Sequence, residues 1–307
     1  MRIKKKKVVA ANSPAFDLPG PYDAADNNSL KAQRFFLRLR RTQLTLLVVA
    51  AVGSTLRLKV NGTGPDWAGV VAVVAFVLAA AAELAVLNLR PDRTWFDGRA
   101  VAESVKTLAW RYSVGGDPFG LADPDVQKAD ALLVGRIDEV IKEFPSRALV
   151  PAGEAGEYIT ESMRATRGKS LAERKQLYRQ SRIDDQRRWY AGKAKFNDSL
   201  AQKWGIAIVA IQCIGALGAL FKALGIIELD LLAVVSAIAA SALAWLQIKQ
   251  HSVLAESYSL AANELSAVVA LIDKYDTEAT WASFVDEAEK AISREHTAWK
   301  ALRGSRR

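Results

Sequence analysis

The stretch AFVLAAAAELAVLNLR, residues 75–90, carries a single carboxylate, Glu83, among alanines, valines and leucines. It belongs to a nearly uncharged run from Ala68 to Leu89, which as a helix would be about 33 Å long. That length is enough to cross a hydrocarbon layer of roughly 30 Å. We therefore predict that this run spans a membrane and that Glu83 lies within the span.

A shorter apolar run precedes this one and would pair with it as a hairpin. Leu44 to Leu56 has, by itself, the length of a buried helix in a soluble protein. If Arg57 and Lys59 direct their charged ends outward, the span extends to Val60, and the polar segment VNGTGPDW then makes a tight turn. The sequence thus predicts a first transmembrane hairpin.

The same plan returns later in the chain. Ile206 to Leu220 and Leu231 to Leu246 flank the turn FKALGIIELD, in which Lys222 must also direct its charge outward. Tryptophans lie at or near the ends of the apolar runs, where an indole ring stays in an apolar layer while its N–H reaches water. These expected interface anchors are Trp67, Trp95, Trp204 and Trp245.

Basic residues crowd one side of both predicted hairpins, whereas the two turns carry only Arg57, Lys59 and Lys222. An excess of Lys and Arg marks the cytoplasmic side of a membrane protein. We therefore expect both termini and the long middle segment in the cytoplasm. The net charge of +9 fits this membrane edge, so membrane lipids are expected as partners and nucleic acid is not.

The N-terminal segment begins with MRIKKKKVVA, which resembles the start of a signal peptide, but no apolar core of sufficient length follows. No cleavable signal is therefore expected, and the lysines would touch anionic lipid or be solvated. Cys213 is the only cysteine, which excludes a disulfide within the chain.

Each predicted hairpin is followed by a related segment, RAVAESVKTLAWRY after the first and HSVLAESYSLAANEL after the second. Glu103 aligns with Glu256 at an offset of 256 − 103 = 153 residues. This match predicts a parallel duplication of a hairpin and a cytoplasmic helix. The expected parts are a flexible basic arm (1–29), a first two-transmembrane unit (30–145), a linker (146–169) and a second two-transmembrane unit with long cytoplasmic helices (170–303).

The two copies are expected to differ where the spans end. Pro91 should end the helix that leaves the second span, whereas no Gly or Pro occurs from Ile226 to Arg303. The fourth span is therefore expected to continue into the cytoplasm without a break. Its continuation has an apolar stripe at helical spacing, formed by Leu254, Tyr258, Ala261, Leu265, Val268 and Ile272.

Other helices would pack against this stripe. Ser170-Leu171-Ala172-Glu173 has the form of a capping box and would start a helix that continues to the third span. One more helix is expected from about Pro124 to Glu143, and a final amphipathic helix would complete a cytoplasmic helical bundle. The apolar face of the final helix consists of Trp281, Val285, Ala288, Ile292 and Trp299. The fold class expected is an all-α membrane protein with two tandem transmembrane hairpins, four spans in all, that continue into this bundle.

Several segments resemble a known family. RRWYAGKAKFNDSLAQKW before one span, AESYSLAANEL after another and AEKAISREHTAWKAL near the end resemble the SLATT families, two-transmembrane effector domains associated with SMODS nucleotidyltransferases and SLOG sensors. WFDGRAVAESVKTLAWRYSVGGDPF resembles a second, diverged unit, so that the resemblance covers about residues 30–302.

This resemblance implies an effector of the bacterial inner membrane that acts in antiphage or conflict systems. Such a protein would perforate or depolarise the membrane when a nucleotide signal or a sensor protein triggers it. No nucleotidyltransferase, SLOG or TIR pattern is visible in this sequence. The trigger is therefore expected to come from another molecule.

The sequence offers few candidates for catalysis. His251 and His296 are the only histidines, and Cys213 lies in a predicted span. Neither a Gly-rich phosphate loop nor the spacing of metal ligands is present. We therefore expect no enzymatic activity, no cofactor and no metal.

Glu83 must face a cavity or a partner, because an ionised carboxylate in lipid costs several kcal/mol. Either it lines a water-filled path, where carboxylates from several chains would attract cations, or it is protonated or paired with an arginine such as Arg90. Further intramembrane polar candidates are Gln212 and Ser236. When the two hairpins are aligned, the counterpart of Glu83 is Ser236 or Ala240, depending on the gap chosen. For Gln212 an interhelical hydrogen bond is the favoured role.

Further candidate residues lie next to the membrane. Those expected to form a gate or to pack there are Glu103, Trp110, Arg111, Glu256 and Tyr258. Pairing with Arg or Lys from a neighbouring helix is the favoured role of the two glutamates. Arg187 and Arg188 would contact the phosphate of a ligand or trigger, or are boundary charges.

These features support two hypotheses of different classes. Four short helices from one chain hardly enclose a wide pore, so an ion-conducting or pore-forming effector would be a homo-oligomer with inorganic ions as permeants. Alternatively, the protein is a membrane-anchored helical interaction module or scaffold that does not conduct. A small-solute transporter fits less well, because the repeat is parallel and no broken helix interrupts a span.

Overall fold

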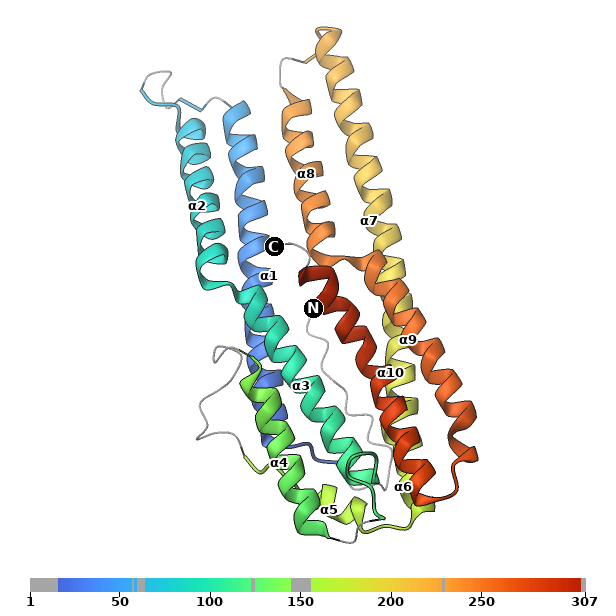
Figure 1. Ribbon diagram of the computed structural model, residues 1–307. Coiled ribbons are helices and arrows are strands. Elements are labelled where there is room, and N and C mark those ends of the chain that lie inside the picture. Colours follow the sequence, from blue (N-terminus) through green and yellow to red (C-terminus); the bar gives the residue numbers. More distant parts are fainter. Residues whose placement is uncertain are drawn as a thin grey trace. The chain divides into compact units, whose positions relative to one another are not determined.

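The computed structural model describes residues 16–56, 58–59, 64–122, 125–144, 156–227 and 230–304, with side chains up to residue 293. Across these ranges the regular structure is entirely helical (Figure 1). The elements are α1 (Gly20–Thr55), α2 (Trp67–Leu89), α3 (Pro91–Val114), α4 (Val126–Lys142), α5 (Glu161–Arg167), α6 (Leu171–Leu177), the π-helix η4 (Tyr178–Asp184), α7 (Asp185–Ala223), α8 (Leu231–Lys249), α9 (His251–Leu271), the 3-10 helix η5 (Ile272–Lys274) and α10 (Glu278–Gly304).

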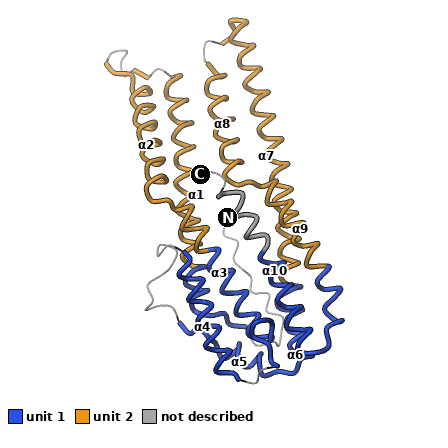
Figure 2. The backbone as a smooth tube through the Cα atoms, in the orientation of Figure 1, with its two compact units in different colours: residues 1–26, 99–184, 267–307 blue, residues 27–98, 185–266 orange. Residues whose placement is uncertain are grey.

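The chain divides into two compact units, shown in different colours in Figure 2. Unit 1 comprises residues 1–26, 99–184 and 267–307, and unit 2 comprises residues 27–98 and 185–266. Helices α1, α3 and α9 each have residues in both units, and η4 is followed directly by α7 at the boundary.

Unit 2 contains the apolar helices. Three helical stretches are long and apolar enough to cross a membrane, and 11–17% of each most apolar window is buried within the chain: Trp67–Val114, Leu171–Ala223 and Leu231–Lys274. Exposed side chains such as Val73 (65%), Phe76 (62%) and Ile206 (72%) need an apolar solvent. The protein is therefore a membrane protein, as predicted.

The first predicted span differs from this expectation. Helix α1 ends at Thr55, so the extension to Val60 is wrong, and α1 is not among the three stretches of sufficient length and hydropathy. Its apolar part begins only after Arg40 and Arg41 and would be about 21 Å long.

Helices α1 and α2 form a hairpin (Figure 1). Asp66, the N-cap of α2, accepts hydrogen bonds from the N–H groups of Leu58 (2.9 Å) and Ala68 (3.1 Å), which fixes the chain on both sides of the turn. Gly53 allows the two helices to approach closely, because a Cβ there would lie 2.8 Å from the carbonyl oxygen of Ala68.

Helices α7 and α8 form the second hairpin, and small residues allow close packing as predicted. A Cβ at Gly215 would lie 3.0 Å from Val235, and a Cβ at Gly218 would lie 2.9 Å from Leu231. In the turn, Lys222 binds Asp230, the N-cap of α8, at 2.7 Å. The charge of Lys222 is therefore paired rather than only directed outward.

Both hairpins are followed by a break in the helix. Arg90 (φ 44°) ends α2 in the left-handed region, and Pro91 starts α3, as predicted. Gln250 (φ 50°) ends α8 in the same way, so the expectation of an unbroken fourth span is wrong. A non-glycine residue in this region is uncommon, and nothing in the sequence indicated the second break.

Unit 1 has its own core, which α3, α4 and α5 share with residues before α1. The predicted stripe on α10 is confirmed for Trp281, Val285, Ala288 and Ile292, which are at most 4% exposed. The side chain of Trp299 lies outside the described residues. The buried residues of the core cluster are Ala25, Val101, Ala102, Val105, Ala109, Tyr112, Phe119, Ala129, Leu133, Ile137 and Met163.

Two expected irregular segments contain helix instead. Within the expected arm of residues 1–29, α1 starts at Gly20 and its Ala25 is fully buried. The linker 146–169 contains α5, which buries Met163 and Arg167. Residues 1–15 and 145–155 lie outside the described residues.

Candidate functional site

A fully buried ion pair joins η4 to α10 inside unit 1. The guanidinium of Arg182 binds the carboxylate of Glu289 through two hydrogen bonds, Nε to Oε1 at 2.9 Å and Nη2 to Oε2 at 2.6 Å. The side chains are 1% and 0% exposed. Such a bidentate pair fixes both the distance and the angle between the two helices.

Two neutral side chains complete the coordination of Glu289. The hydroxyl of Tyr178 donates to Oε1 at 3.0 Å, and the hydroxyl of Thr107 donates to Oε2 at 2.9 Å. Each carboxylate oxygen therefore accepts two hydrogen bonds, which offsets part of the cost of burying the charge. We call these four residues, Thr107, Tyr178, Arg182 and Glu289, the buried charge centre.

The π geometry of η4 lies within this centre. Its first residue, Tyr178, and its fifth, Arg182, both reach Glu289. The helix that contains them begins at the capping box of Ser170 and Glu173, which is confirmed, and continues through η4 into α7. Short π segments within α-helices are frequent at functional sites.

Three buried side chains bind the backbone where α3 ends. Arg167 Nη1 donates to the carbonyl oxygens of Tyr112 (2.9 Å) and Phe119 (2.7 Å). Arg174 Nη1 and Trp281 Nε1 both donate to the carbonyl oxygen of Val114, at 2.7 and 2.8 Å. These donors satisfy carbonyl groups that a helix end leaves without partners.

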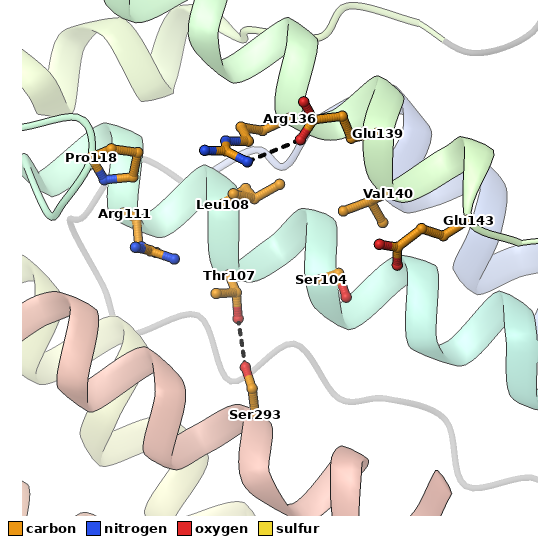
Figure 3. A pocket seen from close by; sticks show the side chains of 10 residues that line it. All are labelled: Ser104, Thr107, Leu108, Arg111, Pro118, Arg136, Glu139, Val140, Glu143 and Ser293. Carbon is orange, nitrogen blue, oxygen red and sulfur yellow. Dashed lines mark hydrogen bonds and ion pairs between the residues drawn. The ribbon is translucent and has the colours of Figure 1, made fainter. Parts of the chain in front are cut away.

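A pocket of about 450 Å³ opens beside the buried charge centre within unit 1 (Figure 3). Thr107 connects the two, because it lines the pocket and donates to Glu289, and its hydroxyl lies 3.4 Å from that of Ser293. Arg136 and Glu139 form an ion pair at 3.0 Å on the opposite wall, from α4. The lining residues are Ser104, Thr107, Leu108, Arg111, Pro118, Arg136, Glu139, Val140, Glu143 and Ser293.

In unit 2, Glu83 has a partner on the neighbouring helix. Its carboxylate binds the guanidinium of Arg40 and accepts a hydrogen bond from Gln43 Nε2 at 2.7 Å. Arg40 also donates to Gln43 Oε1 at 2.8 Å, so the three side chains form a closed group between α1 and α2. The paired alternative thus describes Glu83 in this chain, but the arginine is Arg40 and not Arg90.

The other intramembrane candidates lie elsewhere. Gln212 on α7 and Ser236 on α8 are exposed, and neither forms a hydrogen bond with a described residue. The interhelical hydrogen bond expected for Gln212 is therefore absent from the described part of this single chain.

The candidates next to the membrane fall into two groups. Glu103 is 5% exposed and binds Arg99 (2.7 Å) and Lys106 (3.4 Å), which lie on the same helix, α3, and not on a neighbouring helix as expected. Glu256 is exposed, and it lies six residues after Gln250, whereas Glu103 lies 13 residues after Arg90. The two glutamates are therefore not at matched positions.

The aromatic and basic candidates also differ in burial and in contacts. Trp110 is buried and stacks on Phe16, with ring centroids 4.0 Å apart. Tyr258 packs against Trp189 and Tyr190 in unit 2. Arg111 binds Asp286. Arg188 is exposed and Arg187 is partly exposed.

The four tryptophans expected at the interface also differ. Trp67 is the first residue of α2 and is 48% exposed. Trp95 packs against Phe36 and Phe96, and Trp204 is partly exposed on α7. Trp245 contacts two cations, Arg41 and Lys249.

Sequence reasoning missed the buried charge centre. One signal was available, because Glu289 follows Val285 by four residues and so lies on the apolar stripe of the last helix. An acid at such a position needs a buried partner. Arg182 is separated from it by more than a hundred residues, so its choice as the partner depends on the tertiary fold.

The described residues contain no group of three or more His, Cys, Asp and Glu side chains that could hold a metal ion. In the part of the chain that the structure describes, Arg111, Arg136 and Glu139 at the pocket and Arg182 and Glu289 at the centre form ion pairs. Their arrangement can hold helices together and can respond to a ligand.

These features define an all-helical membrane protein in which unit 2 contains the apolar helices and unit 1 contains a buried charge centre beside a pocket. The chain belongs to the SLATT family: residues 19–175 match SMODS and SLOG-associating 2TM effector domain 3, and residues 178–299 match SMODS and SLOG-associating 2TM effector domain 1. It is therefore a membrane effector with two SLATT units in tandem, as the resemblance implied. No curated protein and no solved structure matches the chain.

Proposed function

We propose that the protein is a homo-oligomeric effector of the bacterial inner membrane that conducts ions, and that its second hairpin lines the conducting path. The observation that carries this proposal is the exposure of Gln212 in the apolar part of α7 without a hydrogen-bonding partner in the described chain. An amide in lipid costs several kcal/mol, whereas an amide that faces water between several chains does not.

The proposed topology has four spans: the three long apolar stretches and, in addition, α1, which is the first span along the chain. Its short apolar part would cross because Arg40 is paired with Glu83 and the flanking charges reach the interface. The excess of basic residues opposite the turns supports a cytoplasmic location of the termini and of the helices of unit 1. In a Cys213→Ala background, Leu224→Cys should be labelled from the periplasmic side and Gln127→Cys only from the cytoplasmic side.

Liposome flux tests the conduction. Gln212→Leu should reduce ion flux by at least tenfold, because it removes the polar group from the path. Cys213→Ala is the matched control, since Cys213 is the adjacent exposed residue of the same helix, and it should leave the flux unchanged. If Gln212→Leu conducts like the wild type, the second hairpin does not line a path.

The trigger, a nucleotide signal or a sensor protein, would act on unit 1. We place its action at the pocket, because Thr107 joins the pocket wall to Glu289. Thr107→Val retains the shape but cannot donate to Glu289, so it should change the response to the trigger. Arg187 and Arg188 belong to unit 2, so their proposed contact with the phosphate of a ligand is separate from the pocket. Neither catalysis nor a cofactor is part of the proposal.

A membrane-anchored interaction module is the second candidate, and the pairing of Glu83 with Arg40 favours it. A neutralised carboxylate holds helices together and does not select ions. Under this alternative, toxicity in cells would survive Gln212→Leu and Ser236→Ala but would be lost when residues on the exposed surface of unit 1 are changed.

A further inference from the structure

Two cations in unit 2 contact the same indole ring. The guanidinium carbon of Arg41, on α1, lies 5.4 Å from the ring centroid of Trp245, and Nζ of Lys249, on α8, also lies 5.4 Å from it. Each contact is favourable by itself, because the face of an aromatic ring attracts cations. Together they place the two like charges within about 11 Å of one another.

Neither charge is neutralised by the described part of the chain. Arg41 and Lys249 form no ion pair there, in contrast to the adjacent Arg40, which binds Glu83. Two cations that repel each other and have no carboxylate create a strong local preference for an anion.

The position of the two cations along their helices indicates which anion they meet. Arg41 lies 14 residues before the end of α1 at Thr55, and Lys249 lies 18 residues after the start of α8 at Leu231, which corresponds to about 21 and 27 Å of helix. The length along α8 is close to the roughly 30 Å thickness of the hydrocarbon layer, and on the shorter α1 the long side chain of Arg41 can extend toward the same boundary. Both cations therefore lie at the end of the apolar helix that is remote from its hairpin turn, at the depth of lipid headgroups. A tryptophan at the same level is typical of that boundary.

We propose that Arg41, Lys249 and Trp245 form a binding site for the phosphate of an anionic lipid headgroup, between the first and second hairpins. This inference rests on the proposed insertion of α1 and α8 in the membrane. The phosphate binds both cations, and the contacts of both cations with the ring of Trp245 hold their side chains in position. The bound lipid links a helix of each hairpin, so that it stabilises their association.

Binding can be measured on the full chain in a neutral detergent, by native mass spectrometry and by the shift in unfolding temperature. The probes are a phosphatidylglycerol, a phosphatidylcholine and inorganic phosphate. The phosphatidylglycerol should bind and raise the unfolding temperature, and the other two should do so at least tenfold less effectively. Arg41→Gln and Lys249→Gln should each weaken phosphatidylglycerol binding about tenfold, whereas Lys249→Arg should retain it.

Arg38→Gln is the matched control. Arg38 lies one turn before Arg41 on the same helix, is exposed and has no contact with Trp245. Its replacement removes the same charge and should change binding less than twofold. Equal losses in Arg38→Gln and Arg41→Gln would show diffuse attraction and overturn the site, as would unchanged binding in Lys249→Gln.

Two further outcomes test the kind of ligand and the membrane insertion on which the site depends. If inorganic phosphate binds as well as the phosphatidylglycerol, the site serves a soluble anion and the lipid proposal is wrong. If the chain is released from membranes by alkaline carbonate without detergent, the proposed membrane insertion fails, and the lipid site fails with it.

Discussion

The protein contains two arginine–glutamate pairs that differ in burial. Arg182 and Glu289 in unit 1 are 1% and 0% exposed, whereas Arg40 and Glu83 in unit 2 are 22% and 36% exposed within the chain. The first glutamate accepts four hydrogen bonds from three residues, and the second accepts bonds from two residues. The same two residue types therefore form a buried ion pair between helices in unit 1 and a partly exposed ion pair between helices in unit 2.

The comparison shows that burial, and not residue type, sets the energetic role of each pair. A buried ion is costly unless its partners remain, so removal of one partner is severe. A partly exposed pair costs less to break where water solvates the charge that is left. Substitutions on each pair measure this difference directly.

The largest effect is expected for Glu289→Ala. This change leaves the guanidinium of Arg182 buried without its partner, and should destabilise the protein by about 3–5 kcal/mol. Thermal or denaturant unfolding in detergent measures the loss. A loss below about 1 kcal/mol would show that water reaches Arg182 and that the centre is not sealed.

A double replacement sharpens the same comparison. Arg182→Met with Glu289→Leu removes both charges and retains most of the volume, so it should recover at least half of the stability that Glu289→Ala loses. The outcome is read from the same unfolding curves. If the double variant is as unstable as the single variant, the hydrogen bonds of Tyr178 and Thr107 contribute more than the charge pair does.

For the second pair the expected effect depends on the solvent. Arg40→Met leaves Glu83 without its cation, and should cost about 1 kcal/mol in detergent, where water reaches the carboxylate. In a bilayer the cost should rise, because an unpaired carboxylate in lipid is more expensive. Unfolding in both media provides the test, with Glu83→Gln in the Arg40→Met background as the variant that should restore stability in the bilayer.

The smallest effect is expected for the pair of Arg136 and Glu139 on α4, whose side chains are 51% and 65% exposed. Arg136→Ala should change the unfolding free energy by less than about 0.5 kcal/mol. This variant adds a mostly exposed ion pair to the comparison of the buried and the partly exposed pair. A loss comparable to that of Arg40→Met would break the proposed relation between burial and energetic role.

The sequence predicted what local pattern determines. Three of the four apolar runs, the capping box at Ser170 and the described part of the stripe on the last helix agree with the structure, and each depends on residues within a few turns of one another. Membership in the SLATT family was also predicted from short segments. The four-span topology and the cytoplasmic position of the termini remain predictions.

What the sequence did not predict depends on distant partners or on backbone conformation. Arg40 as the partner of Glu83 and Arg182 as the partner of Glu289 follow from the packing of helices that are far apart in the chain. The break at Gln250 required a left-handed backbone at a residue that usually avoids it. The first span was predicted too long, because Arg57 and Lys59 were assumed to lie within the helix, which ends at Thr55.

The π-helix η4 has a mechanical consequence for everything that follows it in the chain. A π turn contains about one residue more than an α turn, so a change from π to α geometry would rotate the downstream helix about its axis by roughly 100° for each residue released. Because η4 continues directly into α7, such a rotation would be transmitted to the helix that contains Gln212.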